Sequence, residues 1–314
     1  VLESSKGKLH KWLIKAICFF CGVILLGIAT GAILLNRIYD LSGWNLRQSQ
    51  PSAPNAPITD GAQTDKYISS LLVVVQNAPL STENAFADMG FIVSFNALDQ
   101  ELTTAALWHG LELKLEDDRT VTVGELYASE GPAALLDAIN TTFGLNIASY
   151  ACTDTSSLAA MIDLLGGISA ELTAEEAEYL NRALSGSELR AGEVVLTGTQ
   201  SMVHAMDEIS GEFAFGGLQR SLRLVDSAVL NMRRTATKET MLPLLAKVMG
   251  SINSDLDIET VRGFAYEVLK AEEFSIHSLP VPCEGSFEWL EQGDARCLAV
   301  DLEANKAALR ELIY

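Results

Sequence analysis

The sequence is short of positive charge, and this shortage limits the classes of protein that it can encode. It contains 22 lysine and arginine residues against 41 aspartate and glutamate residues, which gives a formal net charge of −19. Proteins that bind nucleic acid neutralise phosphates with clustered basic side chains. The sequence has no basic stripe interleaved with aromatic residues. It therefore argues against nucleic-acid binding.

The motifs of several common enzyme classes are also missing. The sequence has no Gly-x-Ser-x-Gly nucleophile elbow, no His-Glu-x-x-His zinc motif and no phosphate-binding loop. Each of these motifs holds a nucleophile, a metal ion or a phosphate at a defined turn or helix face. Hydrolase and nucleotide-binding functions therefore have no support from the sequence.

One long segment near the N-terminus, residues 16–35, has no charged side chain. At about 1.5 Å per residue, a helix of this length crosses the roughly 30 Å hydrocarbon layer of a bilayer. A cleaved signal peptide would have a shorter apolar core and a cleavage site with small residues. This segment is followed by Asn36-Arg37-Ile38-Tyr39 instead. We therefore expect a retained transmembrane helix over residues 16–36.

The charges that flank this segment predict its orientation. Four lysines precede it, whereas only Arg37 and Arg47 follow shortly after it, and positive flanks stay in the cytoplasm. The prediction is a single-pass protein of the cell membrane, with a cytoplasmic tail at residues 1–15 and a proline-containing extracytoplasmic linker at residues 37–66. An extracytoplasmic domain at residues 67–314 would follow. Beyond residue 35 the chain carries 18 of the 22 basic residues and 40 of the 41 acidic residues, a balance of −22.

Two of the five cysteines are candidates for a disulfide. Cys283 and Cys297 bracket a short segment that contains Gly285 and Gly293, which is typical of two strands joined by a loop. Disulfides form outside the cytoplasm. Closing a loop of about 15 residues contributes roughly 3 kcal/mol in the chain-entropy model. We predict this pair to be bonded, and we predict Cys152 to be a buried free thiol because it lies in an apolar stretch.

The order of apolar patterns predicts the fold class. Apolar, β-branched runs predict strands at residues 68–75, 89–95, 101–109, 111–115, 147–152 and 168–172, and a β-rich stretch at residues 273–300. Helical patterns occupy residues 122–128, 132–142, 156–165, 199–206, 215–232, 239–250, 258–270 and 302–313. In the clearest helix, residues 215–232, apolar side chains recur every three or four positions. This mixture predicts an α/β fold, a three-layer αβα sandwich with a central mixed sheet.

Four segments in order resemble the LytR-CpsA-Psr family of bacterial cell-envelope proteins. Residues 87–94, Ala-Asp-Met-Gly-Phe-Ile-Val-Ser, are similar to the family's Ser-Asp-Thr strand. Residues 143–147 and 162–168 are similar to its Leu-Gly-Ile-x-Ile and Asp-x-Leu-Gly-Gly-Val segments. Residues 196–205 resemble Leu-Asn-Gly-Glu-Gln-Ala-Leu-Ala-Tyr-Ala, and residues 215–220, Phe-Gly-Gly-Leu-Gln-Arg, resemble Phe-Gly-Arg-x-x-Arg-Gln.

The resemblance implies a phosphotransferase that moves a glycopolymer from a polyprenyl-pyrophosphate lipid to peptidoglycan. In such a reaction, clustered arginines and a magnesium ion held by carboxylates neutralise the pyrophosphate. The lipid tail lies in an apolar tunnel between sheet and helices. The implied catalytic residues are Asp88, which would also be the metal ligand, and Arg220. Arg220, Arg223 and His109 are the implied substrate-binding residues.

The sequence departs from the family where this chemistry takes place. The family's arginine positions hold Phe86, His109, Met206 and Gly217, and its metal-binding aspartate position holds Gly110. Loss of one preorganised charge partner removes roughly 3–4 kcal/mol of transition-state stabilisation. We therefore expect a degenerate member of the family with little transferase activity.

Three hypotheses about function follow. The first is an envelope protein that binds a polyprenyl-linked glycan without chemistry, and the second is an active transferase with a rearranged site of Asp88, His109, Arg220 and Arg223. The third is an extracytoplasmic interaction domain that has lost the lipid. Each candidate residue also has a structural interpretation: a strand or turn cap for Asp88, a surface ion pair for Arg220, and an ordinary strand-end histidine beside Trp108 for His109.

Overall fold

The fold is described from a computed structural model. It describes residues 67–96, 98–115, 117, 119–207, 209, 213–235, 251–256, 275–292 and 295–314. The predicted transmembrane helix, the predicted linker, and the helices predicted at residues 239–250 and 258–270 lie outside these residues. Within the described ranges, no helix combines the length and apolar character that a membrane crossing requires.

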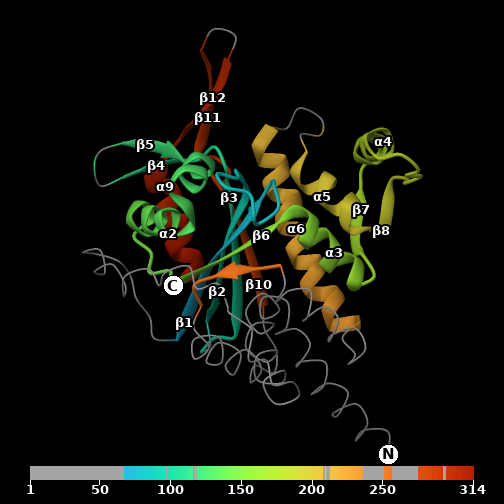
Figure 1. The fold of residues 1–314 in the computed structure, drawn as a ribbon, viewed down its shortest axis with the longest axis horizontal. Helices are drawn as coiled ribbons and strands as arrows, with labels where there is room; N and C mark the ends of the chain where they lie inside the picture. The colour runs from blue at the N-terminus through green and yellow to red at the C-terminus, as the bar shows by residue number, and fades with distance from the viewer. Residues whose placement is uncertain are drawn as a thin grey trace, which may run out of the picture.

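A six-stranded mixed sheet forms the centre of the fold (Figure 1), with the strand order β10-β3-β2-β1-β6-β9. Its strands are β1 (Ile68–Gln76), β2 (Ala87–Asn96), β3 (Glu101–Trp108), β6 (Ser149–Asp154), β9 (Asn253–Ser254) and β10 (Ser275–Val281). Strand β1 is parallel to β6, and β3 is parallel to β10, whereas the other neighbours are antiparallel. The predicted central mixed sheet is therefore confirmed.

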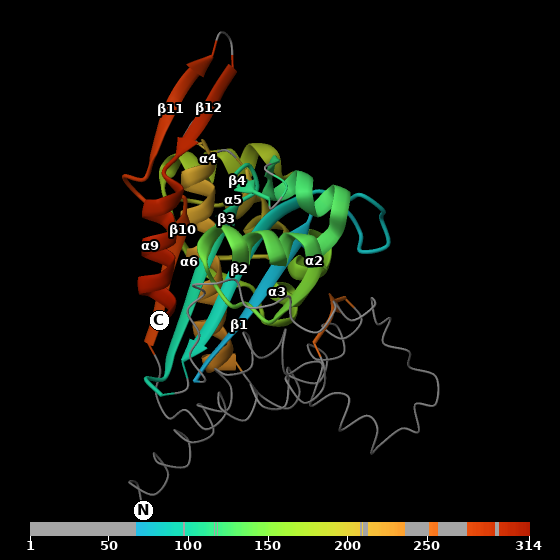
Figure 2. The same cartoon turned by 90° about the vertical axis from the view of Figure 1, so that its left-hand side faces the viewer.

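Helices cover both faces of this sheet (Figures 1 and 2). On one face lie α3 (Thr155–Leu164), α5 (Gly198–Met206) and α6 (Phe213–Thr235), and on the other lie α2 (Val123–Phe143) and α9 (Leu302–Ile313). Successive side chains of a strand point to opposite faces. Leu71 and Val73 of β1 accordingly join the core under α6, whereas Leu72 and Val74 join the core under α2. The described residues thus form three layers, with one large apolar core on each face of the sheet.

Local signals in the sequence set the helix boundaries. Helix α2 begins with a capping box. The Thr122 hydroxyl accepts a hydrogen bond from the backbone N–H of Glu125, and the Glu125 carboxylate accepts one from the backbone N–H of Thr122. Within α2, Gly131 has a φ of 84°, and Pro132 follows it, so the helix is kinked between the two segments that the sequence predicts as separate helices. After α3, Gly166 adopts a φ of 81°, a left-handed conformation that favours glycine.

Two elements beside α5 are not among the predicted ones. Strand β7 (Ile168–Leu172) was expected, but α4 (Ala174–Ala183) and β8 (Gly192–Leu196) were not. The buried residues of α4 are Glu176, Ala177 and Leu180, so the helix has little apolar pattern to reveal it. Strand β8 pairs with β7 in an antiparallel ladder. Strands β4 (Glu112–Lys114) and β5 (Thr120–Thr122) form another short pair.

A hairpin of β11 (Phe287–Gln292) and β12 (Ala295–Val300) extends away from the body of the protein (Figure 2). The predicted disulfide is not formed, because Cys283 is a free, half-buried thiol. The hairpin register explains this: Phe287 pairs with Val300, and Cys297 pairs with Leu290, well along the strand from Cys283. Cys152 is a buried free thiol, as predicted.

Candidate functional site

Two of the residues that the family resemblance singles out lie at the same end of the sheet. Asp88 is at the start of β2, and His109 follows the end of β3. The two strands are antiparallel, and their register places Met89 opposite Trp108. Trp108 and Met206, at the end of α5, pack against the same apolar core. The region around this end of the sheet is therefore the candidate site.

Asp88 lies in a β-bulge, a form of irregularity that redirects a side chain. The register of β1 against β2 shifts here, since Val75 pairs with Met89 while Gln76 pairs with Ala87. Burial raises the pKa of Asp88 to about 6. A cation within about 4–6 Å would lower this pKa, and no described residue forms an ion pair or a hydrogen bond with the Asp88 carboxylate. The carboxylate is thus half-buried without a charge partner among the described residues.

Aromatic rings surround the position where the family would place its second carboxylate. The ring of Trp108 lies over Gly110, so a Cβ atom at Gly110 would lie 2.6 Å from that ring. The Phe86 ring lies against Gly124 in the same way and forms an edge contact with His109, with ring centroids 5.6 Å apart. His109 itself is exposed, and its ring centroid lies 5.9 Å from that of Trp108. Aromatic rings therefore pack around Gly110 and Gly124 at this end of the sheet.

Arg220 has a structural role that sequence patterns did not reveal. Its side chain is only 2 % exposed. Its Nε atom donates a hydrogen bond to the carbonyl of His204 at 2.6 Å, and Nη2 donates to the carbonyl of Asp207 at 2.7 Å. The last carbonyls of a helix have no partner within the helix, and a cation there also meets the negative end of the helix dipole. Arg220 thus caps the C-terminal end of α5.

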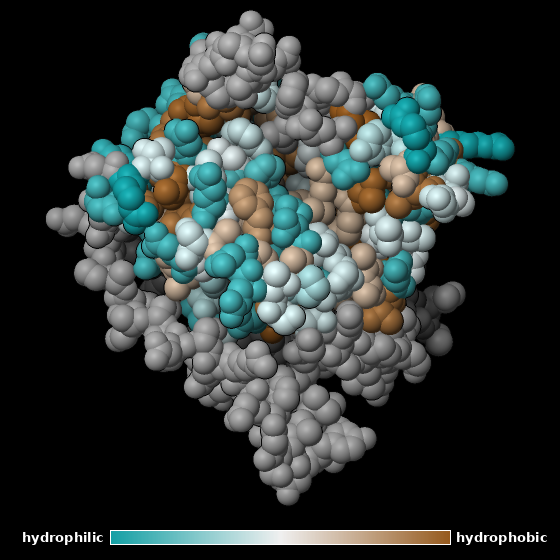
Figure 3. Space-filling model, turned by 45° about the horizontal axis from the view of Figure 1, so that its top comes forward, coloured by the Kyte–Doolittle hydropathy of each residue, from teal (hydrophilic) through white to brown (hydrophobic). Residues whose placement is uncertain are grey.

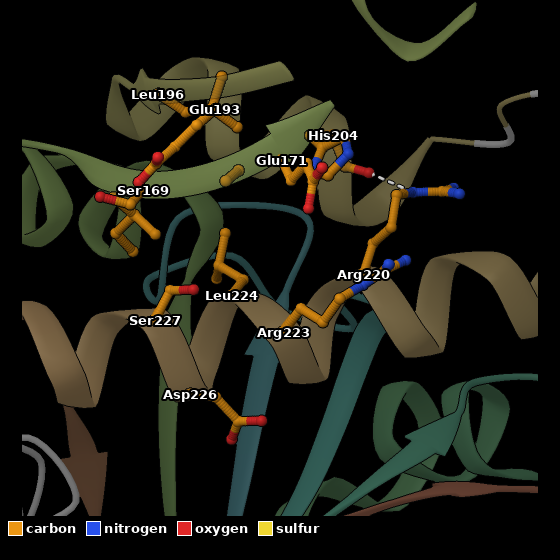
Figure 4. A pocket seen from close by; sticks show the side chains of 12 residues that line it. Ser169, Glu171, Glu193, Leu196, His204, Arg220, Arg223, Leu224, Asp226 and Ser227 are labelled. Carbon is orange, nitrogen blue, oxygen red and sulfur yellow. Dashed lines mark hydrogen bonds between the residues drawn. The ribbon is translucent and has the colours of Figure 1, made fainter. Parts of the chain in front are cut away.

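Arg223, nearly one turn further along α6, lines a pocket to which Arg220 also contributes. A pocket of about 470 Å³ lies between α6, the β7–β8 pair and α5 (Figure 4). Its polar lining residues are Ser169, Glu171, Glu193, His204, Arg220, Arg223, Asp226 and Ser227. Arg223 is exposed in this pocket. The sequence did not indicate the pocket, because one of its walls, β8, was not predicted.

His204 connects two helices beside this pocket. Its Nε2 atom lies 3.1 Å from Oε1 of Glu176, and both side chains are buried. Burial lowers the pKa of His204, and the neighbouring Glu176 opposes this effect only in part. Burial raises the pKa of Glu176, but hydrogen bonds from Thr173 and the contact with His204 outweigh it and lower the pKa overall. The pair fastens α4 to α5.

An apolar cavity of about 50 Å³ lies between the sheet and helices α3 and α6. It is lined by Leu71, Val73, Val75, Met89, Phe91, Val93, Thr153, Leu158, Leu224 and Val225. Ligand sites commonly measure roughly 300–1,000 Å³, so this cavity is narrow. On the face that Figure 3 draws, apolar side chains form separate patches among hydrophilic ones. In the described residues, no group of three or more metal-ligating side chains is positioned to hold an ion.

The sequence profile of the LytR_cpsA_psr family matches residues 82–309. The match covers most of the chain, so this protein belongs to the LytR-CpsA-Psr family. No curated protein matches the chain significantly in sequence.

Solved structures of low sequence identity share the fold. TagT bound to LIIa-WTA has a TM-score of 0.64 and 12 % identity, with 85 % of this chain and 98 % of that chain covered. YwtF (TagT) of Bacillus subtilis with bound octaprenyl pyrophosphate lipid has a TM-score of 0.60 and 11 % identity, with the same coverage. An Enterococcus faecalis protein described as a transcriptional regulator has a TM-score of 0.59 and 17 % identity, with 78 % and 88 % covered.

Proposed function

We propose that this protein is a membrane-anchored member of the LytR-CpsA-Psr family that binds polyprenyl-phosphate-linked glycan without catalysing its transfer to peptidoglycan. The N-terminal apolar segment would hold the domain at the outer side of the cell membrane, close to this lipid. The fold shared with TagT, which was solved with octaprenyl pyrophosphate, supports the choice of ligand. The apolar lining of the cavity between the sheet and α6 suits such a tail, although the present volume of about 50 Å³ is too small to hold it.

The arrangement around Asp88 is the main reason for proposing that this protein does not catalyse the transfer. Transfer from a pyrophosphate requires preorganised cations or a metal ion where negative charge develops. The rings of Phe86 and Trp108 occupy the space around Gly124 and Gly110. Burial raises the pKa of Asp88 to about 6, which disfavours its carboxylate relative to that of an exposed aspartate, and Gly110 stands at the family's second carboxylate position. We therefore propose that magnesium is not needed for the function of this protein.

Arg220 contributes little to binding a free phosphate in this proposal. Two of its donors already bond the last carbonyls of α5, and the side chain is buried. Lipid binding would instead depend on the apolar tail. The cavity must widen to hold such a tail, and Met89 in its wall has a flexible side chain that adapts to new contacts.

Native mass spectrometry of the full-length protein, purified in detergent, tests the lipid-binding part. The expected result is a co-purified polyprenyl phosphate that is lost in Val225→Phe, which fills the cavity. Val195→Phe is the matched control, because Val195 is 61 % exposed and lies on β8 away from the cavity. Thermal melting of both variants shows whether they are folded. No lipid in the unaltered protein would refute lipid binding and favour the lipid-free interaction domain.

A transfer assay tests the catalytic part separately. The purified protein is incubated with a polyprenyl-pyrophosphate-linked glycan, peptidoglycan and magnesium, and a family member with the complete arginine set serves as the positive control. We expect no product above background. Turnover that disappears in Asp88→Asn would refute the proposal and would support the alternative, an active transferase that uses Asp88, His109, Arg220 and Arg223.

A further inference from the structure

The polar pocket beside α6 contains charges of both signs that no other described residue neutralises. Glu171 of β7 and Glu193 of β8 face each other directly across the antiparallel ladder. Like charges in this position destabilise a β-sheet. Both side chains are exposed and line the pocket, and neither forms an ion pair or a hydrogen bond with a described residue. One wall of the pocket thus presents two carboxylates that have no counter-ion in the described part of the chain.

The opposite wall presents a guanidinium group. Arg223 lies on α6, faces the pocket, and has no hydrogen bond or ion pair with any described residue. Figure 4 shows Glu171 pointing from its strand toward the helix that carries Arg223. Asp226 lies on the same helix, but its carboxylate already accepts a hydrogen bond from Ser278 at 3.0 Å. Arg223 is therefore the cation of this pocket that is available to a ligand.

His204 provides a buried polar atom at the same pocket. Its side chain is 6 % exposed and belongs to the pocket lining. Its Nε2 atom is held by the Glu176 carboxylate, so Nε2 carries the proton and Nδ1 is left as an acceptor. Within the described structure, Nδ1 has no hydrogen-bond partner, and it is not completely enclosed by other protein atoms. A ligand in the pocket can therefore donate a hydrogen bond to Nδ1.

We infer that this pocket binds a zwitterionic ligand, with an ammonium group at Glu171, Glu193 and His204 and a carboxylate at Arg223. The ligand class is a short peptide with a free amino group and a free carboxyl group. A volume of about 470 Å³ suits a molecule of this size. This site goes beyond the proposed lipid function, because it lies on the polar side of α6 and does not require the apolar cavity.

Isothermal titration calorimetry of the full-length protein in detergent tests this inference. The probe is the tripeptide L-alanyl-L-alanyl-L-alanine, and two blocked forms, one acetylated at the N-terminus and one amidated at the C-terminus, are its controls. We expect the free tripeptide to bind and each blocked form to bind at least about tenfold more weakly. Absence of binding, or equal binding of a blocked form, would overturn the inference.

Matched variants locate the binding site. We expect Glu171→Gln, Glu193→Gln and Arg223→Gln each to weaken binding about tenfold or more, whereas Glu178→Gln and Arg190→Gln leave it unchanged. Glu178 and Arg190 are exposed and lie outside the pocket lining. If binding weakens in Glu171→Gln and Glu193→Gln but persists in Arg223→Gln, the inference that the pocket recognises both the amino and the carboxyl end of the peptide is overturned. Val225→Phe is expected to abolish lipid binding and leave tripeptide binding intact, so the two functions can fail independently.

Discussion

Replacement of Asp88 by asparagine should stabilise the folded protein at neutral pH. Burial raises the pKa of Asp88 from 3.8 to about 6. At about 1.4 kcal/mol per pH unit, this difference corresponds to roughly 3 kcal/mol of destabilisation when the carboxylate is ionised. The side chain is only half-buried, so solvent screening reduces the expected effect to about 1–2 kcal/mol. Asparagine has nearly the same shape and no charge to desolvate.

The pH dependence identifies the cause of this stabilisation. Because the pKa of this acid is raised in the folded state, the folded protein binds more protons than the unfolded chain between pH 3.8 and about pH 6. The contribution of Asp88 is therefore neutral below this window and becomes unfavourable as the pH rises through it. The free energy of unfolding of Asp88→Asn should exceed that of the unaltered protein at pH 7, and this difference should shrink toward zero as the pH falls to 4 and below.

Urea unfolding of the full-length protein in detergent, followed by circular dichroism at pH 4 to 8, measures this difference. Glu83→Gln is the control, since Glu83 is exposed and has no interaction with the described residues. A less stable Asp88→Asn variant at pH 7 would contradict the reasoning. So would magnesium that stabilises the unaltered protein but not the variant, because Asp88 would then be a metal ligand.

Three further substitutions test the packing and charge arrangement. Gly110→Asp should destabilise the protein by roughly 1–3 kcal/mol in urea unfolding, because its Cβ would lie 2.6 Å from the Trp108 ring. Trp108→Ala should relieve part of this effect, and an equal loss of stability with and without Trp108→Ala would refute the steric explanation. Arg220→Met should lower the free energy of unfolding by roughly 3 kcal/mol, since the carbonyls of His204 and Asp207 at the end of α5 lose their charged donor. A change below about 0.5 kcal/mol would show that capping of α5 by Arg220 is unimportant for stability. Glu193→Gln should raise the melting temperature, corresponding to about 0.2–1 kcal/mol, by removing repulsion from Glu171; a lower melting temperature would show that the pair is already neutralised.

The main elements of the fold were predictable because their patterns are local. Strands β1 and β2 are apolar runs buried on both faces of the sheet, and α6 carries a stripe with helical spacing. Helix α4 was missed because half of its residues are exposed and few of them are large and apolar, and strand β8 was missed because it is only five residues long. The disulfide prediction was wrong because spacing along the chain does not fix a hairpin register.

The candidate site was predictable only in part. The family resemblance placed Asp88 and His109 near each other, and the antiparallel register of β2 and β3 brings them to the same end of the sheet. It did not indicate that Arg220 would cap α5 or that the Trp108 ring would cover Gly110. These contacts depend on how side chains pack, which motif spacing does not encode.

The sequence by itself determined the acidic balance, the α/β class and the family, because composition and short apolar periods depend on neighbouring residues. The tertiary structure alone decided the charge state and the partners of the site residues. Burial in the β-bulge sets the pKa of Asp88, and the β7–β8 ladder sets Glu171 opposite Glu193. Both effects depend on desolvation and on distances between atoms that come together only when the chain is folded.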